Sequence, residues 1–200
     1  MIACGAIAQA VAEASTRHTV SIDVHPLPPG LHNRPDRIPA AVEEMVGELR
    51  GRYDDVPVGY ADCGTYGALD QVCARLGVVR LPGSTCFDIY AGESHYDALM
   101  SEQPGTFIVT DYLVKSFSHT VIHGLGLDRF PELRDDYFQH YTRMVWLVQT
   151  TDAQEEAELW PLARAAAERI SLPLEVLHTG VLGLRDALSV LVGQVRPARR

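Results

Sequence analysis

The chain has 200 residues, of which 46% are hydrophobic, and it carries a formal net charge of -9 with a pI near 5.3. A chain of this length and composition can bury a full hydrophobic core, which excludes a disordered protein. The acidic charge argues against nucleic acid or an anionic membrane as a partner, and no apolar run approaches the ~20 residues that a membrane span requires.

The first half of the chain alternates between strand and helix patterns. Residues 1–4 predict a short apolar strand, and the Ala-rich residues 6–15 favour a helix. Residues 20–24 alternate apolar and polar side chains as a second strand does, and a loop rich in Pro and Gly follows them. The further elements predicted here are a helix over residues 38–52, a strand over 56–60, a helix over 69–76 that ends at Gly77, and a strand over 78–81.

The second half continues the same alternation. Residues 143–150 form the most apolar strand of the chain, which predicts a central position in a sheet. Asp152 is expected to cap the helix that follows it. The elements predicted here are strands over residues 106–110, 143–150 and 174–177 and helices over residues 112–117, 153–170 and 182–192.

This alternation predicts an α/β fold with a single domain over residues 1–195. We expect one mostly parallel, open, Rossmann-like sheet with helices on both of its faces. Residues 196–200 are rich in Arg and predict a flexible basic tail. The N-terminus lacks the basic segment of a signal peptide, so we expect a cytoplasmic protein.

Three of the four cysteines follow predicted strands. They are Cys4, Cys63 and Cys86. Because the carboxyl ends of parallel strands line one edge of a sheet, where ligands bind, we expect these thiols to converge. In a reducing compartment such cysteines bind a metal or act in catalysis more often than they form disulfides. Cys73 differs, since it lies on the apolar stripe of a predicted helix and is expected to pack in the core.

The residues beside the thiols predict tight turns. Gly5 follows Cys4, and Gly64 and Thr65 follow Cys63, so we expect these three residues to contact a cofactor. A helix that begins near Thr65 would place its positive end by the Cys63 thiol and lower the pKa of that thiol. The alternative for each cysteine alone is a small buried side chain at a turn.

Two further residues are candidates for catalysis. His32 lies in the loop after the second strand and could serve as a fourth metal ligand, a proton donor or a substrate clamp, or be a surface histidine. Asp111 follows a strand and could act as a general base or cap the next helix. His119 and His123 are spaced to share a helix face, but they lack the Glu of a His-Glu-x-x-His motif.

The chain resembles the bacterial and archaeal domain of unknown function 1638 family, from residue 2 to about residue 185. The segments that carry the resemblance are residues 2–6, 31–35, 60–65, 83–86, 104–107, 110–111, 131–134 and 137–141. The resemblance implies no activity, but it implies that Cys4, His32, Cys63 and Cys86 fall in signature segments. Because members often occur beside corrinoid-dependent methyl-transfer systems, it also implies methyl metabolism and a corrinoid or methyltransferase protein as a partner.

These observations predict a metal-dependent enzyme of the lyase or transferase type with a small-molecule substrate, in one-carbon, methyl or sulfur metabolism. Its metal ligands would be Cys4, Cys63 and Cys86, with or without His32. Three thiolates leave one position open on a [4Fe-4S] iron–sulfur cluster, which we prefer to zinc as the cofactor. One alternative is a non-catalytic metal- or corrinoid-binding accessory protein of a methyltransferase system. Another is a metal-free enzyme with Cys63 as the nucleophile.

Overall fold

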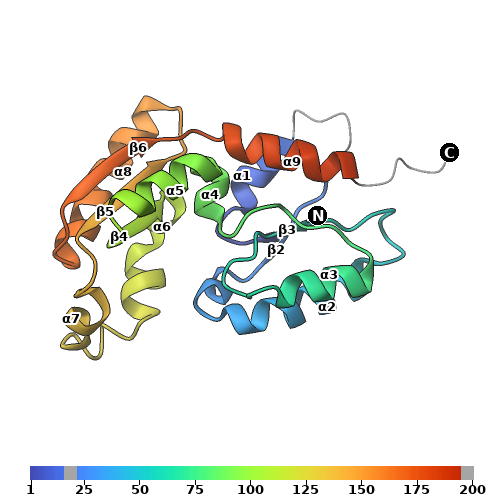
Figure 1. Cartoon of the computed structure of the whole chain (residues 1–200), viewed down its shortest axis with the longest axis horizontal. Coiled ribbons are helices and arrows are strands. Elements are labelled where there is room, and N and C mark those ends of the chain that lie inside the picture. The colour runs from blue at the N-terminus through green and yellow to red at the C-terminus, as the bar shows by residue number, and fades with distance from the viewer. Residues whose placement is uncertain (16–21, 195–200) are drawn as a thin grey trace. The chain divides into compact units, whose positions relative to one another are not determined.

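The structure, a computed structural model, describes residues 1–15 and 22–194 (Figure 1). It contains two compact units, unit 1 and unit 2. Unit 1 consists of residues 1–89 and the final segment that begins at Leu182, and unit 2 is the stretch Tyr90–Val181 between them. The predicted basic tail and part of the strand predicted over residues 20–24 lie outside the described residues. Within those residues, no helix is both long and apolar enough to span a bilayer.

Unit 1 is built on a three-stranded parallel sheet with the order β2-β1-β3. The strands are β1 (Ile2–Cys4), β2 (His25–Leu27) and β3 (Val58–Gly59). The segment that was predicted as a strand over residues 78–81 lies beside β3 and pairs with it through the single parallel bridge Val58↔Arg80. The Val58 amide donates to the Val79 carbonyl oxygen over 2.8 Å, and the Leu81 amide donates to the Val58 carbonyl oxygen over 2.9 Å.

The second strand begins at His25, so its predicted position at residues 20–24 was wrong. The His25 amide donates a 2.8 Å hydrogen bond to the Met1 carbonyl oxygen, and the α-amino group of Met1 donates to the Asp23 carbonyl oxygen over 2.6 Å. These contacts fix Ile2 opposite His25. Pro26 is tolerated because β2 is an edge strand and does not need every backbone N–H.

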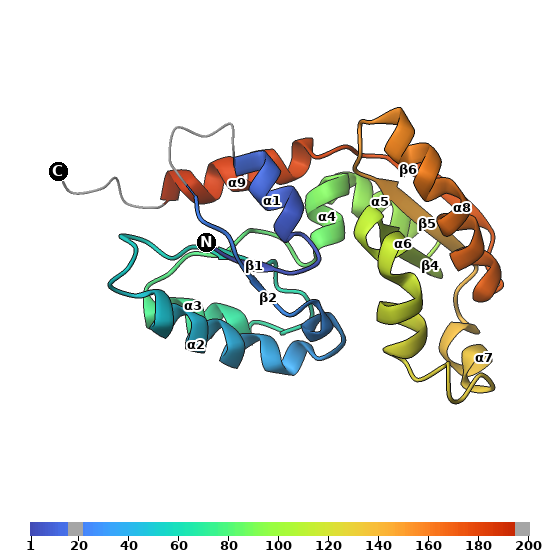
Figure 2. The same ribbon diagram turned by 180° about the vertical axis from the view of Figure 1, so that it is seen from behind.

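Helices cover both faces of the sheet of unit 1. Helices α1 and α9 pack together over one face, and α2 and α3 pack together over the other (Figures 1 and 2). Their bounds are α1 (Ala8–Ser15), α2 (Ile38–Leu49), α3 (Ala68–Leu76) and α9 (Leu182–Gln194). α2 buries Ile38, Val42, Val46 and Leu49, which recur at the helical period that the sequence predicts. Gly77 ends α3 with a positive φ of 65°, as predicted.

Short helical turns connect these elements around the carboxyl edge of the sheet. The loop after β2 contains two 3₁₀ turns, η1 (Pro29–Asn33) and η2 (Pro35–Arg37). Helix α4 (Cys86–Ala91) begins in unit 1 directly after the segment that pairs with β3. These turns are the places where the chain puts the candidate thiols and His32.

Unit 2 has its own three-stranded parallel sheet, of the order β4-β5-β6. The strands are β4 (Thr106–Thr110), β5 (Arg143–Val148) and β6 (Leu174–His178). The central position predicted for the most apolar strand is confirmed, since β5 lies between the other two and is buried along its length. At its start the buried Arg143 guanidinium donates to Thr106 Oγ1 and pairs with Glu175 over 2.9 Å.

The helices of unit 2 lie on both faces of this sheet. α6 and α8 pack together over one face, while α5 lies over the other (Figures 1 and 2). The helical elements are α5 (Glu93–Glu102), α6 (Asp111–Phe117), the π-helical turn η3 (Ser118–His123), α7 (Leu133–Phe138) and α8 (Ala153–Arg169). Asp152 caps α8 as predicted, because its carboxylate accepts a 2.8 Å hydrogen bond from the Gln154 amide.

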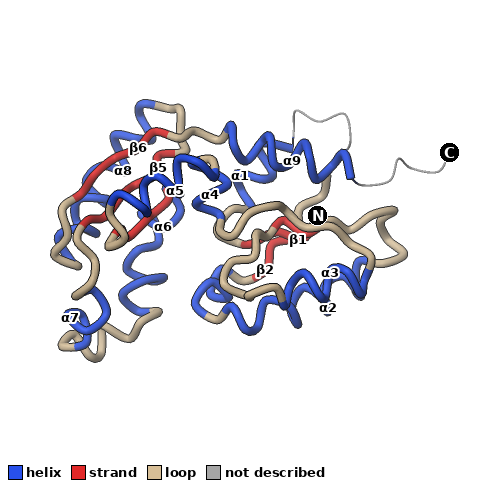
Figure 3. The backbone as a smooth tube through the Cα atoms, in the orientation of Figure 1, coloured by secondary structure: helices blue, strands red, loops and turns tan. Residues whose placement is uncertain are grey.

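The predicted α/β fold with parallel strands and helices is confirmed, but the single open sheet was wrong. The strands form two sheets of three, and those of unit 1 are only two or three residues long (Figure 3). Apolar strand patterns do not show which strands pair, so one sheet and two sheets look alike in the sequence. The assignment of residues 1–195 to one domain stays a prediction.

Candidate functional site

Cys4 is the last residue of β1, and its thiol is buried at the turn that leads into α1. The Ile7 amide donates to the Cys4 carbonyl oxygen over 3.0 Å, which closes this turn. Gly5 is required there, because a Cβ on it would lie 2.6 Å from the Leu27 carbonyl oxygen and 2.9 Å from Pro29 Cδ. The chain after β2 thus passes directly against the Cys4 turn.

Cys63 lies in a loop that the Asp62 carboxylate organises. That carboxylate accepts hydrogen bonds from the Thr65 hydroxyl over 2.7 Å, the Gly67 amide over 2.9 Å and the Tyr66 amide over 3.0 Å. Cys63 and Tyr66 both have positive φ, 51° and 52°, a conformation that costs free energy in residues other than Gly. The Asp62 hydrogen bonds offset that cost and hold Cys63 at the end of β3.

Cys86 is the first residue of α4 and is buried. The turn before it is held by a reciprocal pair, since the Asp88 carboxylate accepts from the Thr85 amide over 3.2 Å and the Thr85 hydroxyl accepts from the Asp88 amide over 3.3 Å. The same carboxylate accepts from the Ser84 amide over 2.7 Å. This capping arrangement fixes the start of α4 at Cys86.

The structure brings the three thiols together at the carboxyl edge of the sheet of unit 1. The Cys63 amide donates to the Ser84 carbonyl oxygen over 2.7 Å, so the Cys63 loop pairs with the chain just before Cys86. The charges of Cys4 and Cys63 each raise the pKa of Cys86, and the charge of Cys4 raises the pKa of Cys63. Such coupling indicates that the three thiols are neighbours.

Burial is the main influence on all three thiols. It raises the pKa of Cys63 to about 12, raises that of Cys86 well above its usual value, and raises that of Cys4. The backbone amides of Ala6 and Ile7 oppose this effect at Cys4 but do not outweigh it. The predicted lowering of the Cys63 pKa was therefore wrong, because α3 begins at Ala68 rather than near Thr65 and desolvation dominates.

Tyr60 lies beside the Cys4 thiol, although its only signal in the sequence is its place at the end of a predicted strand. Its side chain is 1% exposed, and within the described residues its hydroxyl makes no hydrogen bond of normal geometry. Burial raises the pKa of Tyr60, and the neighbouring Cys4 thiol adds to the rise.

His32 lies in η1, in the loop that runs past two of the thiol turns. Pro29 of that loop contacts the Gly5 turn, and Pro35 lies 3.6 Å from the position that a Cβ on Gly64 would take. The imidazole is half-buried, and burial lowers the pKa of His32. Among the described residues it has no hydrogen-bond partner, so its role as ligand or acid stays a prediction.

Thr65, which was expected to contact a cofactor, stabilises the Cys63 loop through its hydrogen bonds to Asp62. Its hydroxyl donates to the Asp62 carboxylate and its amide donates to the Asp62 carbonyl oxygen over 3.1 Å. Gly64 has a positive φ of 81°, which the loop needs. Contact of Gly5, Gly64 and Thr65 with a cofactor stays a prediction.

Asp111 lies in unit 2, where its contacts are structural. Its buried carboxylate accepts hydrogen bonds from Trp146 Nε1 over 2.8 Å and from the amides of Gln149 and Thr150 over 3.0 and 2.7 Å. It does not cap α6 as expected, because the Thr110 hydroxyl takes that position and accepts from the Leu113 amide. Its catalytic role stays a prediction.

Two further observations bear on the site. Cys73 is buried on α3 beside Leu69 and Val72, which confirms its place on the apolar face. Within residues 1–15 and 22–194, no group of three or more His, Cys, Asp or Glu side chains is arranged so that it could hold a metal ion. The three thiols therefore do not form a metal ligand set in this arrangement.

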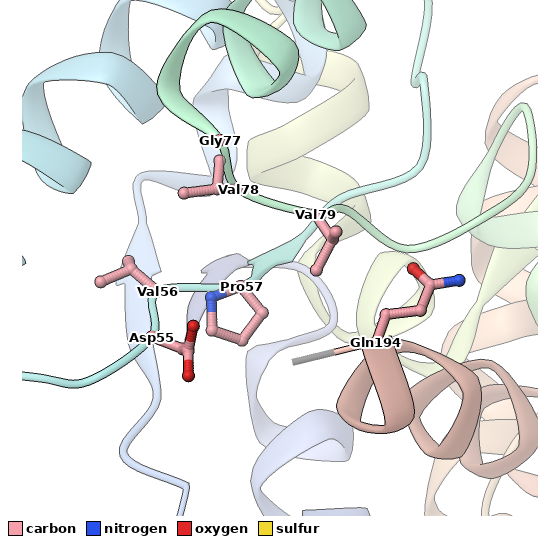
Figure 4. Close-up of a pocket in the computed structure, with 7 residues that line it drawn as sticks. All are labelled: Asp55, Val56, Pro57, Gly77, Val78, Val79 and Gln194. Atoms are coloured by element: carbon pink, nitrogen blue, oxygen red, sulfur yellow. The ribbon is translucent and has the colours of Figure 1, made fainter. Parts of the chain in front are cut away.

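A pocket of about 240 Å³ lies at the opposite edge of the same sheet (Figure 4). Its lining comes from the chain before β3, from the residues after α3 and from the end of α9, and consists of Asp55, Val56, Pro57, Gly77, Val78, Val79 and Gln194. Apart from Gln194 of α9, these residues precede the paired strand segments, whereas the thiols follow them. The pocket is thus separate from the thiol cluster.

The comparison with known proteins identifies the family but no activity. No curated protein and no solved structure matches the chain. A family model described as "Protein of unknown function (DUF1638)" matches residues 26–188, a range that contains His32, Cys63, Cys86 and Asp111 but not Cys4. Because this match covers more than half of the chain, the protein belongs to the DUF1638 family.

Proposed function

We propose that Cys4, Cys63 and Cys86 are the protein ligands of a metal centre at the carboxyl edge of unit 1, and that the protein is a metal-dependent enzyme acting on a small molecule. The observation that carries this proposal is that Cys63 and Cys4 raise the pKa of Cys86 and Cys4 raises the pKa of Cys63, which makes the three thiols neighbours. Each thiol comes from the end of a different strand segment, at the edge where open parallel sheets bind ligands.

The strand order supports this location. The chain steps from β1 to β2 on one side and then crosses β1 to form β3 on the other. In Rossmann-like sheets such a reversal opens a crevice outside the carboxyl ends of the two strands where the order changes. We infer that unit 1 follows this plan, because Cys4 ends β1 and Cys63 follows β3, so that the two thiols flank the crevice.

The raised pKa values argue against a metal-free cysteine nucleophile. With a pKa of about 12, roughly one Cys63 thiol in 10⁵ is ionised at pH 7, which makes a metal-free Cys63 nucleophile a weak alternative. A metal that binds thiolate displaces the proton, so buried thiols of this kind ionise when a metal arrives. Binding would also require the thiol side chains to rotate toward a common centre, since they do not form a finished ligand set.

The donor set suits a [4Fe-4S] cluster better than zinc. Three thiolates leave one iron without a protein ligand, and when bound the cluster would supply an open Lewis-acid position for lyase or transferase chemistry. His32 is assigned to proton transfer, because its lowered pKa leaves it neutral at pH 7 and able to accept a proton. Zinc held by the same thiolates, with or without His32, is the alternative that the experiment below decides.

The cellular setting follows from this chemistry and from the family resemblance. Free thiols and a cluster with an open iron suit a reducing compartment such as the cytoplasm. A role in one-carbon, methyl or sulfur metabolism, with a corrinoid or methyltransferase protein as a partner, rests on the resemblance alone. A non-catalytic accessory protein would hold the same metal without turning over a substrate.

The deciding experiment is metal analysis of protein purified without oxygen. Iron, sulfide and zinc would be quantified with visible absorbance for the wild type and for Cys4→Ala, Cys63→Ala and Cys86→Ala. We expect about four iron and four sulfide per chain in the wild type and loss of both in each variant. Zinc without iron would select the zinc site, and wild-type protein without either metal would overturn the proposal.

The matched control is Cys73→Ala, in the same unit. Cys73 is buried on the apolar face of α3, so this change is expected to lower the free energy of unfolding by about 1 kcal/mol while metal content stays at the wild-type level. Thermal unfolding followed by circular dichroism would confirm that all four variants fold. Equal metal loss in Cys73→Ala and Cys63→Ala would remove the assignment to the three clustered thiols.

A further inference from the structure

Unit 2 carries a pair of histidines on a wide helical turn. After α6 the chain continues into the π-helical turn η3 (Ser118–His123), in which the Gly124 amide donates to the His119 carbonyl oxygen over 3.0 Å. The turn buries Thr120, Val121 and Ile122 and leaves His119 and His123 exposed. π-Helical turns are rare and often occur at functional sites.

The two imidazoles stack on each other. Their ring centroids lie 5.7 Å apart with an angle of 17° between the ring planes. An imidazole nitrogen lies about 2.0–2.1 Å from a zinc ion that it binds, so two rings at this separation can reach one ion after a rotation of their side chains. Because both rings are exposed, no packed neighbour has to move to allow that rotation.

A carboxylate orients the second ring. His123 Nδ1 lies 2.8 Å from Asp128 Oδ2, and this hydrogen bond leaves Nε2 of His123 free. Histidines that bind metals usually donate their other ring nitrogen to a carboxylate in this manner, which fixes the tautomer and makes the free nitrogen a better ligand. This exposed contact alone would contribute little to stability, so it does not explain why a second imidazole is held beside it.

From this arrangement we infer that His119 and His123 form a two-histidine site for a divalent transition metal ion of the class that prefers imidazole, such as Ni²⁺, Cu²⁺ or Zn²⁺. Asp128 positions His123 and is not itself a ligand, so water completes the coordination. The site has two protein donors and stands independently of the thiol site, which lies in unit 1.

The test uses Ni²⁺, whose unpaired electrons broaden the NMR signals of nearby amides. Ni²⁺ would be titrated into ¹⁵N-labelled, untagged full-length protein, together with His119→Gln, His123→Gln, Asp128→Asn and the control His140→Gln, which changes an exposed histidine outside the pair. We expect broadening centred on residues 118–128 in the wild type and in His140→Gln. We also expect an affinity at least about 10-fold weaker in the other three variants.

The location of the broadening separates this site from the thiol site, since Ni²⁺ bound by thiolates would broaden amides around Cys4, Cys63 and Cys86 instead. The same spectra show whether each variant is folded. His123→Gln also removes the contact with Asp128 and could disturb the turn, whereas His119→Gln leaves that contact in place and therefore tests the site by itself. Broadening absent from residues 118–128 in the wild type, or unchanged affinity in His119→Gln, would overturn the inference.

Discussion

The Cys63 amide donates a 2.7 Å hydrogen bond to the carbonyl oxygen of Ser84, two residues before Cys86. A second bond beside it, from the Asp62 amide to the Gly83 carbonyl oxygen over 3.1 Å, makes the contact a short ladder between two loops. Two thiols that are 23 residues apart in sequence are therefore held in register by backbone atoms. Their proximity does not depend on the side chains that would ligate a metal.

The thiols of the metal-free protein should react slowly with iodoacetamide. At pH 8 the pKa of about 12 lowers the ionised fraction of Cys63 by about three orders of magnitude relative to a free cysteine, and the greater nucleophilicity of a more basic thiolate recovers part of that. We expect alkylation of Cys63 on the order of 100-fold slower than in the urea-unfolded chain. Mass spectrometry after timed quenching would measure the rates. One rapidly alkylated Cys63 would instead favour the nucleophile alternative.

The metal-free protein should lose stability at alkaline pH. An unfolded thiol titrates near pH 8.5, whereas folded Cys63 holds its proton to about pH 12, so in this range the folded chain binds more protons than the unfolded one. The contribution of Cys63 is fully present below pH 8.5 and decreases above it by about 1.4 kcal/mol per pH unit. Urea unfolding at pH 7 and pH 10 should therefore show a decrease that is about 2 kcal/mol smaller in Cys63→Ser. Equal decreases in both proteins would contradict the raised pKa.

Gly5→Ala should destabilise the turn that carries Cys4. The added Cβ would lie 2.6 Å from the Leu27 carbonyl oxygen, so the chain after β2 has to shift, at a cost of about 1–3 kcal/mol in the free energy of unfolding. Gly30→Ala is the matched control, because a Cβ there meets nothing within 4 Å. Urea unfolding should separate the two variants, and similar values for both would show that the close approach at Gly5 is not a constraint.

Asp111→Asn should lower the stability of the fold. The amide group of Asn cannot accept hydrogen bonds from Trp146 Nε1 and from the Gln149 and Thr150 amides together, which leaves at least one buried donor without a partner. We expect a decrease of about 1–3 kcal/mol in the free energy of unfolding. Asp152→Asn, at a position where Asn caps a helix as well as Asp does, should stay near the wild type. Unchanged stability in Asp111→Asn would show that these hydrogen bonds are not needed for the fold.

The sequence predicted the elements better than it predicted their pairing. Cys4, Cys63 and Cys86 could be placed at one edge because each follows an apolar segment, and parallel strands end at a common edge. The second strand was misplaced because Val20, Ile22 and Val24 alternate as a strand does, while the Met1 contacts that select His25 are tertiary. The two-sheet division was missed for the same reason.

The chemistry of the site was harder to predict than its position. The depth at which a thiol is buried depends on packing from distant segments, so the raised pKa of Cys63 could not be read from the glycines beside it. Asp111 follows a strand and precedes a helix, the usual place of a cap, yet its carboxylate turns to Trp146, 35 residues away. Thr110 and Asp111 offer equivalent capping signals in sequence, and tertiary contacts decide between them.

The return of the chain to unit 1 at Leu182 sets an order for folding during synthesis. α9 packs against α1, so unit 1 lacks one of its covering helices until residues 182–194 have left the ribosome. At 5–20 residues per second, the interval between Ile89 and Leu182 lasts on the order of ten seconds. During that interval the surface of α1 that α9 later covers is exposed to solvent and to chaperones. Unit 2 is one continuous segment and can fold as it emerges.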